Sequence, residues 1–212
     1  HGAWWIEPAF DVERYCELRT ESDFRLFESQ AEGWRYMLDA AASASRELGI
    51  GIGYMSALDR TRPLDSARTR MQVTAEMVNS GQHIIDCHCG DYRGRHPGIV
   101  AIGLHSNEAG HPPEPFAEVF AEVVGQTGLL STPHAGEIAP AADQGPASVA
   151  GALDALHADR ILHGVLAVED PALVERLAAE QVCLDVCPTS NILLSVFPSL
   201  AEHPLPALLS AG

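Results

Sequence analysis

Short apolar runs alternate along the chain with longer stretches whose apolar residues recur at helical spacing. The apolar runs predict strands at residues 3–7, 50–55, 99–104, 129–133, 160–162 and 182–186. The stretches between and after them predict helices at residues 30–48, 64–78, 116–124, 146–156, 170–180 and 204–210. Continuous apolar strands separated by helices are typical of a parallel sheet covered by helices.

Polar residues follow the last three predicted strands: His134 and Glu137, then His163, then the turn that contains Asn191. In a barrel of parallel strands, the carboxyl ends form the catalytic face. A doubly wound sheet is the competing architecture, but no glycine-rich phosphate turn follows the first strand. We therefore predict an α/β fold of the (β/α)8 TIM-like barrel type, incomplete, with about six of eight strands present.

We expect residues 1–212 to form a single partial barrel domain, with residues 80–98 as an insertion or an extended connection. That segment contains two histidines and two cysteines between His83 and Cys89, but their spacing fits no structural zinc pattern. A second pair of ligands at loop-closing distance would be needed. We favour an extended connection without a metal.

Composition narrows the partners and the compartment. The net charge of −16 and a pI near 4.8 argue against nucleic acid and anionic membrane surfaces as partners. Five cysteines, an odd number, do not indicate a disulfide framework. No apolar run approaches the roughly twenty residues of a membrane span, and the first residues lack the basic region of a signal peptide. We expect a cytoplasmic protein.

The segment from His134 to Glu137 is the strongest chemical signal in the chain. Only Ala135 and Gly136 separate the imidazole from the carboxyl group, so both leave one strand end. One group can hold a metal ion and the other can move a proton, as hydrolytic attack on an unreactive carbon requires.

Three motifs together identify a family. In order and spacing, His134-Ala135-Gly136-Glu137, His163-Gly164 and Cys187-Pro188-Thr189-Ser190-Asn191 resemble those of the adenosine deaminase family, in particular its bacterial members. The resemblance covers nearly the whole chain, from Glu7-Pro8 to Gly212, and is weakest at about residues 80–98. It implies a metal-dependent hydrolase on a TIM-like barrel that uses one zinc ion.

The resemblance also implies roles for individual residues. His134 matches the third zinc histidine, Glu137 the general acid that protonates purine N1, and His163 the histidine that orients the attacking hydroxide. Gly103, Ser106 and Asn107 fall in the loop that contacts the purine. Four further residues are expected to support the site structurally: Gly136, Gly164, Ser190 and Asn191.

The implied reaction is the hydrolysis of adenosine to inosine and ammonia, with a small purine nucleoside or base as the partner. Many relatives have glycine where Ser106 lies, so adenine or 6-amino-6-deoxyfutalosine stays open as the substrate. Another metal-dependent hydrolase of this architecture, such as an amidase or phosphoester hydrolase, is the second class. A non-catalytic binding or scaffold protein is the third.

Of the family's zinc ligands, this sequence matches only His134. The family's first two zinc histidines form a His-x-His pair, which this sequence lacks, and its aspartate ligand would follow Gly212. Zinc sites typically use three or more protein ligands. We therefore expect weak or absent zinc binding in this chain, and activity in the full-length protein.

Four residues near these motifs receive structural interpretations. Cys183 and Cys187 are expected to be small buried residues, Asp185 to stabilise the strand interior, and His203 to lie at the start of a helix.

Overall fold

A computed structural model of the chain describes residues 2–17, 25–138 and 144–212. The chain divides into two compact units. The first contains His1–Gly103 and Ala121–Leu129, and the second contains Leu104–Phe120 and Leu130–Gly212.

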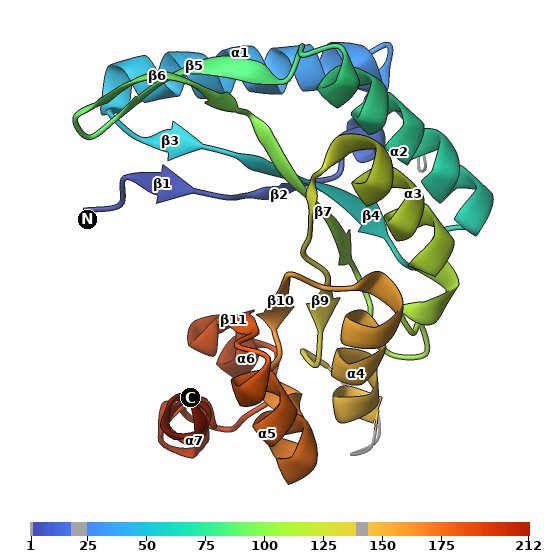
Figure 1. Cartoon of the computed structure of the whole chain (residues 1–212), viewed down its shortest axis with the longest axis vertical. Helices are drawn as coiled ribbons and strands as arrows, with labels where there is room; N and C mark the ends of the chain where they lie inside the picture. Colours follow the sequence, from blue (N-terminus) through green and yellow to red (C-terminus); the bar gives the residue numbers. More distant parts are fainter. Residues whose placement is uncertain (1, 18–24, 139–143) are drawn as a thin grey trace. The chain divides into compact units, whose positions relative to one another are not determined.

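The first unit combines short parallel strand pairs with two helices (Figure 1). β1 pairs with β3 and β2 pairs with β4, both in parallel, and β4 neighbours β7. β5 and β6 form an antiparallel hairpin in which Ile84 pairs with Pro97 and Cys89 with Tyr92. The elements are β1 (Trp5–Ile6), β2 (Ala9–Phe10), α1 (Gln30–Leu48), β3 (Gly51–Ile52), β4 (Tyr54–Asp59), α2 (Leu64–Asn79), β5 (Ile84–Cys89), β6 (Tyr92–Pro97) and β7 (Ile99–His105).

Local sequence fixes both ends of α1. The Ser29 hydroxyl accepts a hydrogen bond from the Glu32 N–H, and the Glu32 carboxylate accepts one from the Glu28 N–H, so side chains satisfy N–H groups at the helix start. Gly49 ends the helix with φ of 70°, a conformation that glycine adopts at little cost. The predicted range 30–48 is confirmed to the residue.

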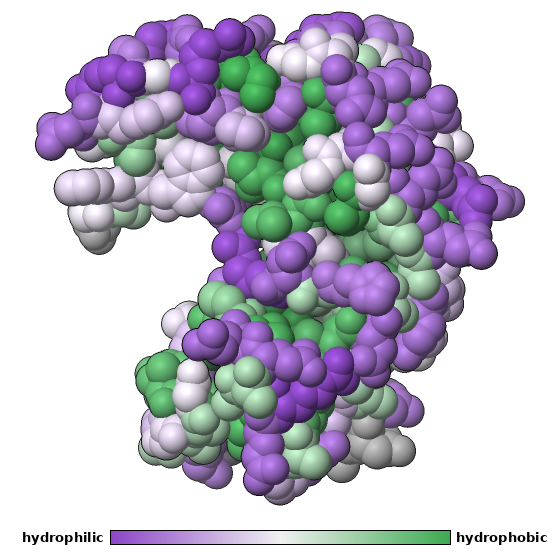
Figure 2. Space-filling view, viewed as in Figure 1, coloured by the Kyte–Doolittle hydropathy of each residue, from purple (hydrophilic) through white to green (hydrophobic). Residues whose placement is uncertain are grey.

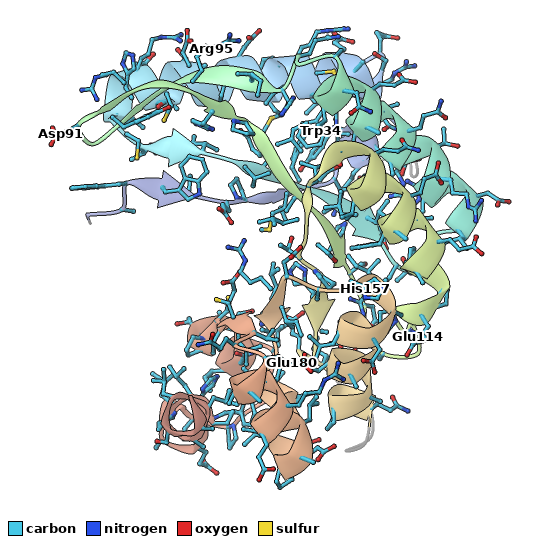
Figure 3. All side chains as sticks on the ribbon, viewed as in Figure 1. Trp34, Asp91, Arg95, Glu114, His157 and Glu180 are labelled. Atoms are coloured by element: carbon cyan, nitrogen blue, oxygen red, sulfur yellow. The ribbon has the colours of Figure 1, made fainter. Side chains whose placement is uncertain are left out.

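The core of the first unit is aromatic, and a buried charge cluster lies at its edge. Trp34 is fully buried, and its ring lies edge-on to those of Phe10 and Tyr54 (Figure 3). The buried Glu13 carboxylate forms ion pairs with Arg62 and with Arg70, whose Nε lies 2.9 Å from Oε2. No motif in the sequence indicated this cluster.

The second unit contains a parallel three-stranded sheet in the order β11-β10-β9. Its core packs Ala135 and Ile161 against residues of α4 and α5, including Val149 and Leu173. α5 begins as predicted, since Asp170 accepts hydrogen bonds from two N–H groups of the first turn and Pro171 follows it. The elements are β8 (Leu130–Ser131), β9 (His134–Ala135), α4 (Gln144–Leu156), β10 (Arg160–His163), α5 (Pro171–Ala179), β11 (Cys183–Asp185), α6 (Pro188–Leu193) and α7 (Leu205–Ala211); the unit boundary crosses α3 (Ala117–Thr127).

The parallel pairing and the covering helices confirm the predicted α/β class. Two predicted details were wrong. The strand expected at 129–133 is divided into β8 and β9 around Pro133, which has no N–H for a strand ladder. Cys183 and Cys187, expected to be buried, are exposed. Residues 84–97, within the segment expected to be an insertion or an extended connection, form a hairpin.

Some apolar side chains of the second unit reach the surface. Leu193, Leu194, Leu200 and Leu209 are 49–79% exposed, and Figure 2 shows hydrophobic side chains on the visible face where Figure 1 draws α6 and α7. Among the described residues, no helix has the length and apolar character that crossing a membrane requires.

Candidate active site

Adjacent parallel strands of the second unit bring the predicted catalytic groups together. His134 opens β9 and pairs in register with Leu162 of β10, while His163 pairs with Ala135. The imidazole rings of His134 and His163 have centroids 5.5 Å apart. Glu137 lies in the turn after β9, and its Oε1 is 3.2 Å from His163 Nε2. The predicted acid and its neighbouring histidine are therefore in close contact.

The contact continues into a chain of hydrogen bonds, here called the Glu137 network. Asn191 Nδ2 lies 3.3 Å from His163 Nδ1, and Asn191 Oδ1 lies 3.2 Å from His203 Nε2. The network ends at the backbone N–H of Leu205, 3.1 Å from His203 Nδ1. Its three inner residues are buried, with His163 at 6%, Asn191 at 0% and His203 at 5% exposure. A buried polar network with every member bonded holds its side chains in one arrangement.

Glu108 anchors the turn that carries Glu137. Its carboxylate, 7% exposed, accepts hydrogen bonds from three successive backbone N–H groups, those of Gly136, Glu137 and Ile138, at 2.6–3.0 Å. Hydrogen bonds to an ionised acceptor are stronger than neutral ones. The Glu108 carboxylate therefore fixes the backbone from which the Glu137 side chain projects.

Backbone conformation also adapts the strand ends to the site. His163 has φ of 69° and is followed by Gly164 at 67°, so a non-glycine residue takes a left-handed conformation at the end of β10. Such conformations cost free energy and concentrate at functional sites. A Cβ on Gly136, which has φ of 63°, would lie 2.5 Å from the Val149 side chain. These two glycines are thus required by geometry, as expected of supporting residues.

Burial sets the charge of the histidines in the Glu137 network. Removal from water lowers the pKa of His163 below its usual value, with the negative charge of Glu108 acting in the opposite direction. Burial likewise lowers the pKa of His203. Both rings are therefore neutral at neutral pH, and each carries a single N–H.

His134 has the hydrogen bond that a metal-binding histidine usually makes. Its Nδ1 lies 3.1 Å from the carbonyl oxygen of Leu104, to which only an N–H can donate. In the neutral ring the lone pair is then on Nε2, the arrangement typical of zinc-ligating imidazoles. Among the described residues, however, no group of three or more histidine, cysteine, aspartate or glutamate side chains could hold a metal ion. The described residues thus fit one zinc ligand, and not a whole zinc site.

Two of the predicted substrate-loop residues, Ser106 and Asn107, lie between Leu104, whose carbonyl oxygen contacts His134, and Glu108, which anchors the Glu137 turn. Gly103 is buried in β7 within the first unit. Ser106 and Asn107 are exposed, and the Asn107 side chain accepts a hydrogen bond from the Ala109 N–H. Ser106 has φ of 80°, which explains why glycine suits this position. Their contact with a purine stays a prediction.

Sequence reasoning placed Asn191 near the site and missed Glu108 and His203. Asn191 and Ser190 both lie in α6, where Asn191 is buried and Ser190 half-buried. Glu108 follows the third predicted strand within the loop already considered, so its proximity to a strand end was an available signal. His203 does bond the first N–H of α7, as expected of a helix-start residue, but its contact with Asn191 depends on folding.

Comparison with known proteins identifies the family of the chain. The family model described as adenosine deaminase matches residues 14–212. An adenine deaminase from Streptomyces coelicolor is 40% identical over 210 residues, which cover 92% of this chain and 59% of the relative.

Two solved structures are also similar. The crystal structure of adenine deaminase from Arthrobacter aurescens matches with a TM-score of 0.76 and 30% identity, covering 100% of this chain and 55% of that one. An amidohydrolase from Burkhoderia ambifaria with bound Zn matches with a TM-score of 0.68 and 25% identity, covering 86% and 45%. The chain thus spans about half the length of these relatives.

The parallel sheets, the covering helices and these likenesses define an α/β protein of the (β/α)8 TIM-like barrel class. Within that class, the chain belongs to the adenosine deaminase family.

Proposed function

We propose that the full-length protein hydrolyses the 6-amino group of a purine and releases ammonia, with adenine as its preferred substrate. The observation that carries the proposal is the contact of Glu137 Oε1 with His163 Nε2 at the end of a buried network. Similar proteins from Streptomyces coelicolor and Arthrobacter aurescens bear the name adenine deaminase, which favours the free base. The family description favours adenosine as the second candidate.

Glu137 is the proton donor in this proposal. Deamination replaces the C6–N bond of the purine with a C6–O bond. C6 is a weak electrophile because the neutral purine ring donates electron density to it. A protonated Glu137 carboxyl group that donates to N1 draws electrons from C6 as the oxygen attacks. General acid catalysis of this kind contributes about 10²–10⁴-fold to rates. Glu108 holds the turn in place so that the donor does not need to reorganise.

His163 is the group that we assign to the attacking oxygen. With its Nδ1 bonded by Asn191, its single N–H is on Nε2, which lies beside Glu137 Oε1 when no substrate is present. In the proposed reaction this N–H donates to the attacking oxygen and stabilises the negative charge on it. The oxygen's remaining proton is then available to the departing amino group, which leaves as ammonia. Neutral His163 fits this role, because burial lowers the pKa of its ring.

In the full-length protein, His134 would supply one imidazole ligand to a zinc ion, and residues other than those described here would supply the rest. A zinc ion held there would lower the pKa of the attacking water towards about 7 and so supply hydroxide at neutral pH.

The test measures ammonia release and the ultraviolet change from amino- to oxopurine with the zinc-loaded, full-length protein. Adenine and adenosine are compared at equal concentrations. Faster turnover of adenine, with one ammonia per product, supports the proposal. Preference for adenosine makes the second candidate correct, and turnover of neither refutes purine deamination.

A further inference from the structure

The Glu137 network ends at a backbone N–H, whose proton stays on its nitrogen. The last donor is the backbone N–H of Leu205, the first residue of α7, and a peptide N–H only donates. His203 Nδ1 accepts this bond, so the single proton of the neutral His203 ring lies on Nε2. That N–H points to Asn191 Oδ1 at 3.2 Å.

The same logic determines the rest of the network. Because His203 Nε2 donates, the Asn191 atom that faces it must be the carbonyl oxygen. The Asn191 amide nitrogen then faces His163 Nδ1 at 3.3 Å and donates to it. The neutral His163 ring therefore carries its proton on Nε2, the ring atom that lies 3.2 Å from Glu137 Oε1.

We propose that His203 is a positioning residue which, through Asn191, selects the Nε2–H tautomer of His163 and so keeps the proton of Glu137 available for the substrate. The inference deepens the proposed function and rests on it for the catalytic consequence, but the tautomer is a property of the protein alone. His203 itself contacts Asn191 and the Leu205 N–H, and so it acts on the reaction only through its neighbours.

The two tautomers of His163 have opposite effects on Glu137. With the proton on Nε2, Glu137 Oε1 faces a nitrogen that has no lone pair to accept a proton, and a proton carried by the carboxyl group stays on Glu137. With the proton on Nδ1, Nε2 would be a base 3.2 Å from the carboxyl group and would accept the proton that N1 of the purine needs. The direction of the network thus decides whether the proton of Glu137 is available to the substrate or is accepted by His163.

Two substitutions of His203 separate positioning from a structural role. In His203→Gln, the amide nitrogen reaches about as far as Nε2 and can still donate to Asn191, whereas the contact with the Leu205 N–H is lost. In His203→Asn, the amide oxygen takes the place of Nδ1 and keeps the α7 contact, whereas the donor to Asn191 is lost. Asn191→Asp offers His163 an acceptor in place of a donor and should reverse its tautomer.

The experiment records ¹⁵N spectra of the histidines in the zinc-loaded, full-length protein at neutral pH, and His163 is assigned by substitution. The kcat and KM of each variant are measured in parallel. We expect protonated Nε2 and unprotonated Nδ1 in the wild type and in His203→Gln, with kcat within about threefold of each other. His203→Asn should show mixed tautomers and Asn191→Asp protonated Nδ1, with kcat lowered by about 10–100-fold and KM little changed. His157→Asn, at an exposed histidine after α4 (Figure 3), is the matched control and should change neither.

A wild-type His163 with its proton on Nδ1 or with both nitrogens protonated overturns the proposal, and this measurement needs no variant. The reverse order of the two His203 variants, with His203→Asn near wild type and His203→Gln impaired, also overturns it, because a residue that only anchors α7 behaves in that way. If the tautomers are as expected but the protein deaminates no purine, the proposed function fails and the tautomer assignment stands.

Discussion

In each of the two units a glutamate side chain is mostly removed from water, with 7% of Glu13 and 15% of Glu137 exposed, and the two side chains have different surroundings. In the first unit, Glu13 is held by the guanidinium groups of Arg62 and Arg70. In the second, Glu137 contacts the neutral ring of His163, at the end of a network without arginine or lysine. Burial raises the pKa of Glu13, and the positive charges of Arg70 and Arg62 act in the opposite direction. The comparison contrasts a glutamate held by ion pairs with the glutamate that we propose as the acid.

We expect the largest effect from a substitution of His134. Replacing it with alanine removes one zinc ligand from the second unit, and the full-length protein should lose stoichiometric zinc and at least about a hundredfold in kcat. Metal analysis after dialysis, together with the ammonia assay, checks this. The control is His88→Ala in the β5–β6 hairpin, which should retain zinc; equal loss in both variants would contradict the assignment.

Glu13→Gln should have the opposite profile. It leaves the buried Arg70 guanidinium without its anion, and loss of one partner of a buried ion pair costs about 3–5 kcal/mol of unfolding free energy. The kcat per folded molecule should stay at the wild-type value. Urea unfolding and active-site-normalised kinetics measure the two quantities, and a fall in kcat with unchanged stability would reverse our distinction between the units.

Glu108→Gln tests the anchor of the Glu137 turn. The amide lacks the charge of the carboxylate, and its NH₂ group cannot accept from the three N–H donors at Gly136, Glu137 and Ile138. We expect a loss of about 1.5–3 kcal/mol in stability, the value of hydrogen bonds to a charged group, with a moderate fall in kcat. Unfolding measurements with Glu114→Gln as the control should show the effect only at Glu108.

Acid should destabilise both units, and we expect this effect to be smaller than those of the three substitutions above. Burial lowers the pKa of His83 in the first unit and of His203 in the second, so the unfolded chain binds protons before the folded one does. This stabilisation is present above about pH 6.5 and is lost as pH falls through the lower folded pKa. Urea titrations from pH 8 to 5 should show a shallower decline in His83→Gln and in His203→Gln. An unchanged slope in both variants would contradict it.

The sequence predicted elements well where local signals and burial agreed. α1 has its Ser29 cap, its helical spacing and its Gly49 stop, and its ends matched. The β5–β6 hairpin did not follow from spacing, because its side chains alternate between two faces: Cys87 is buried against Ser45 while Asp86 is exposed. The close spacing of metal-type residues there therefore gives no common face for all of them.

The same limit applies to the candidate site. His134, Glu137 and His163 could be predicted because strand ends in a parallel sheet lie side by side, so three short motifs were sufficient. His203 is 40 positions beyond His163 and reaches it only through Asn191, and no spacing rule links the three. The ion pairs of Glu13 likewise join residues about 50 positions apart. Long-range partners are set by packing, which a single sequence does not show.

The central claim is that Glu137 is the acid of a purine deaminase, and turnover of adenine by the full-length Glu137→Gln variant tests it most directly. The amide keeps the size of the side chain and its position beside His163 while it removes the acidic proton. We predict a kcat lowered by about 10²–10⁴-fold, with unfolding free energy and zinc content unchanged. A variant that deaminates adenine at the wild-type rate would contradict the account.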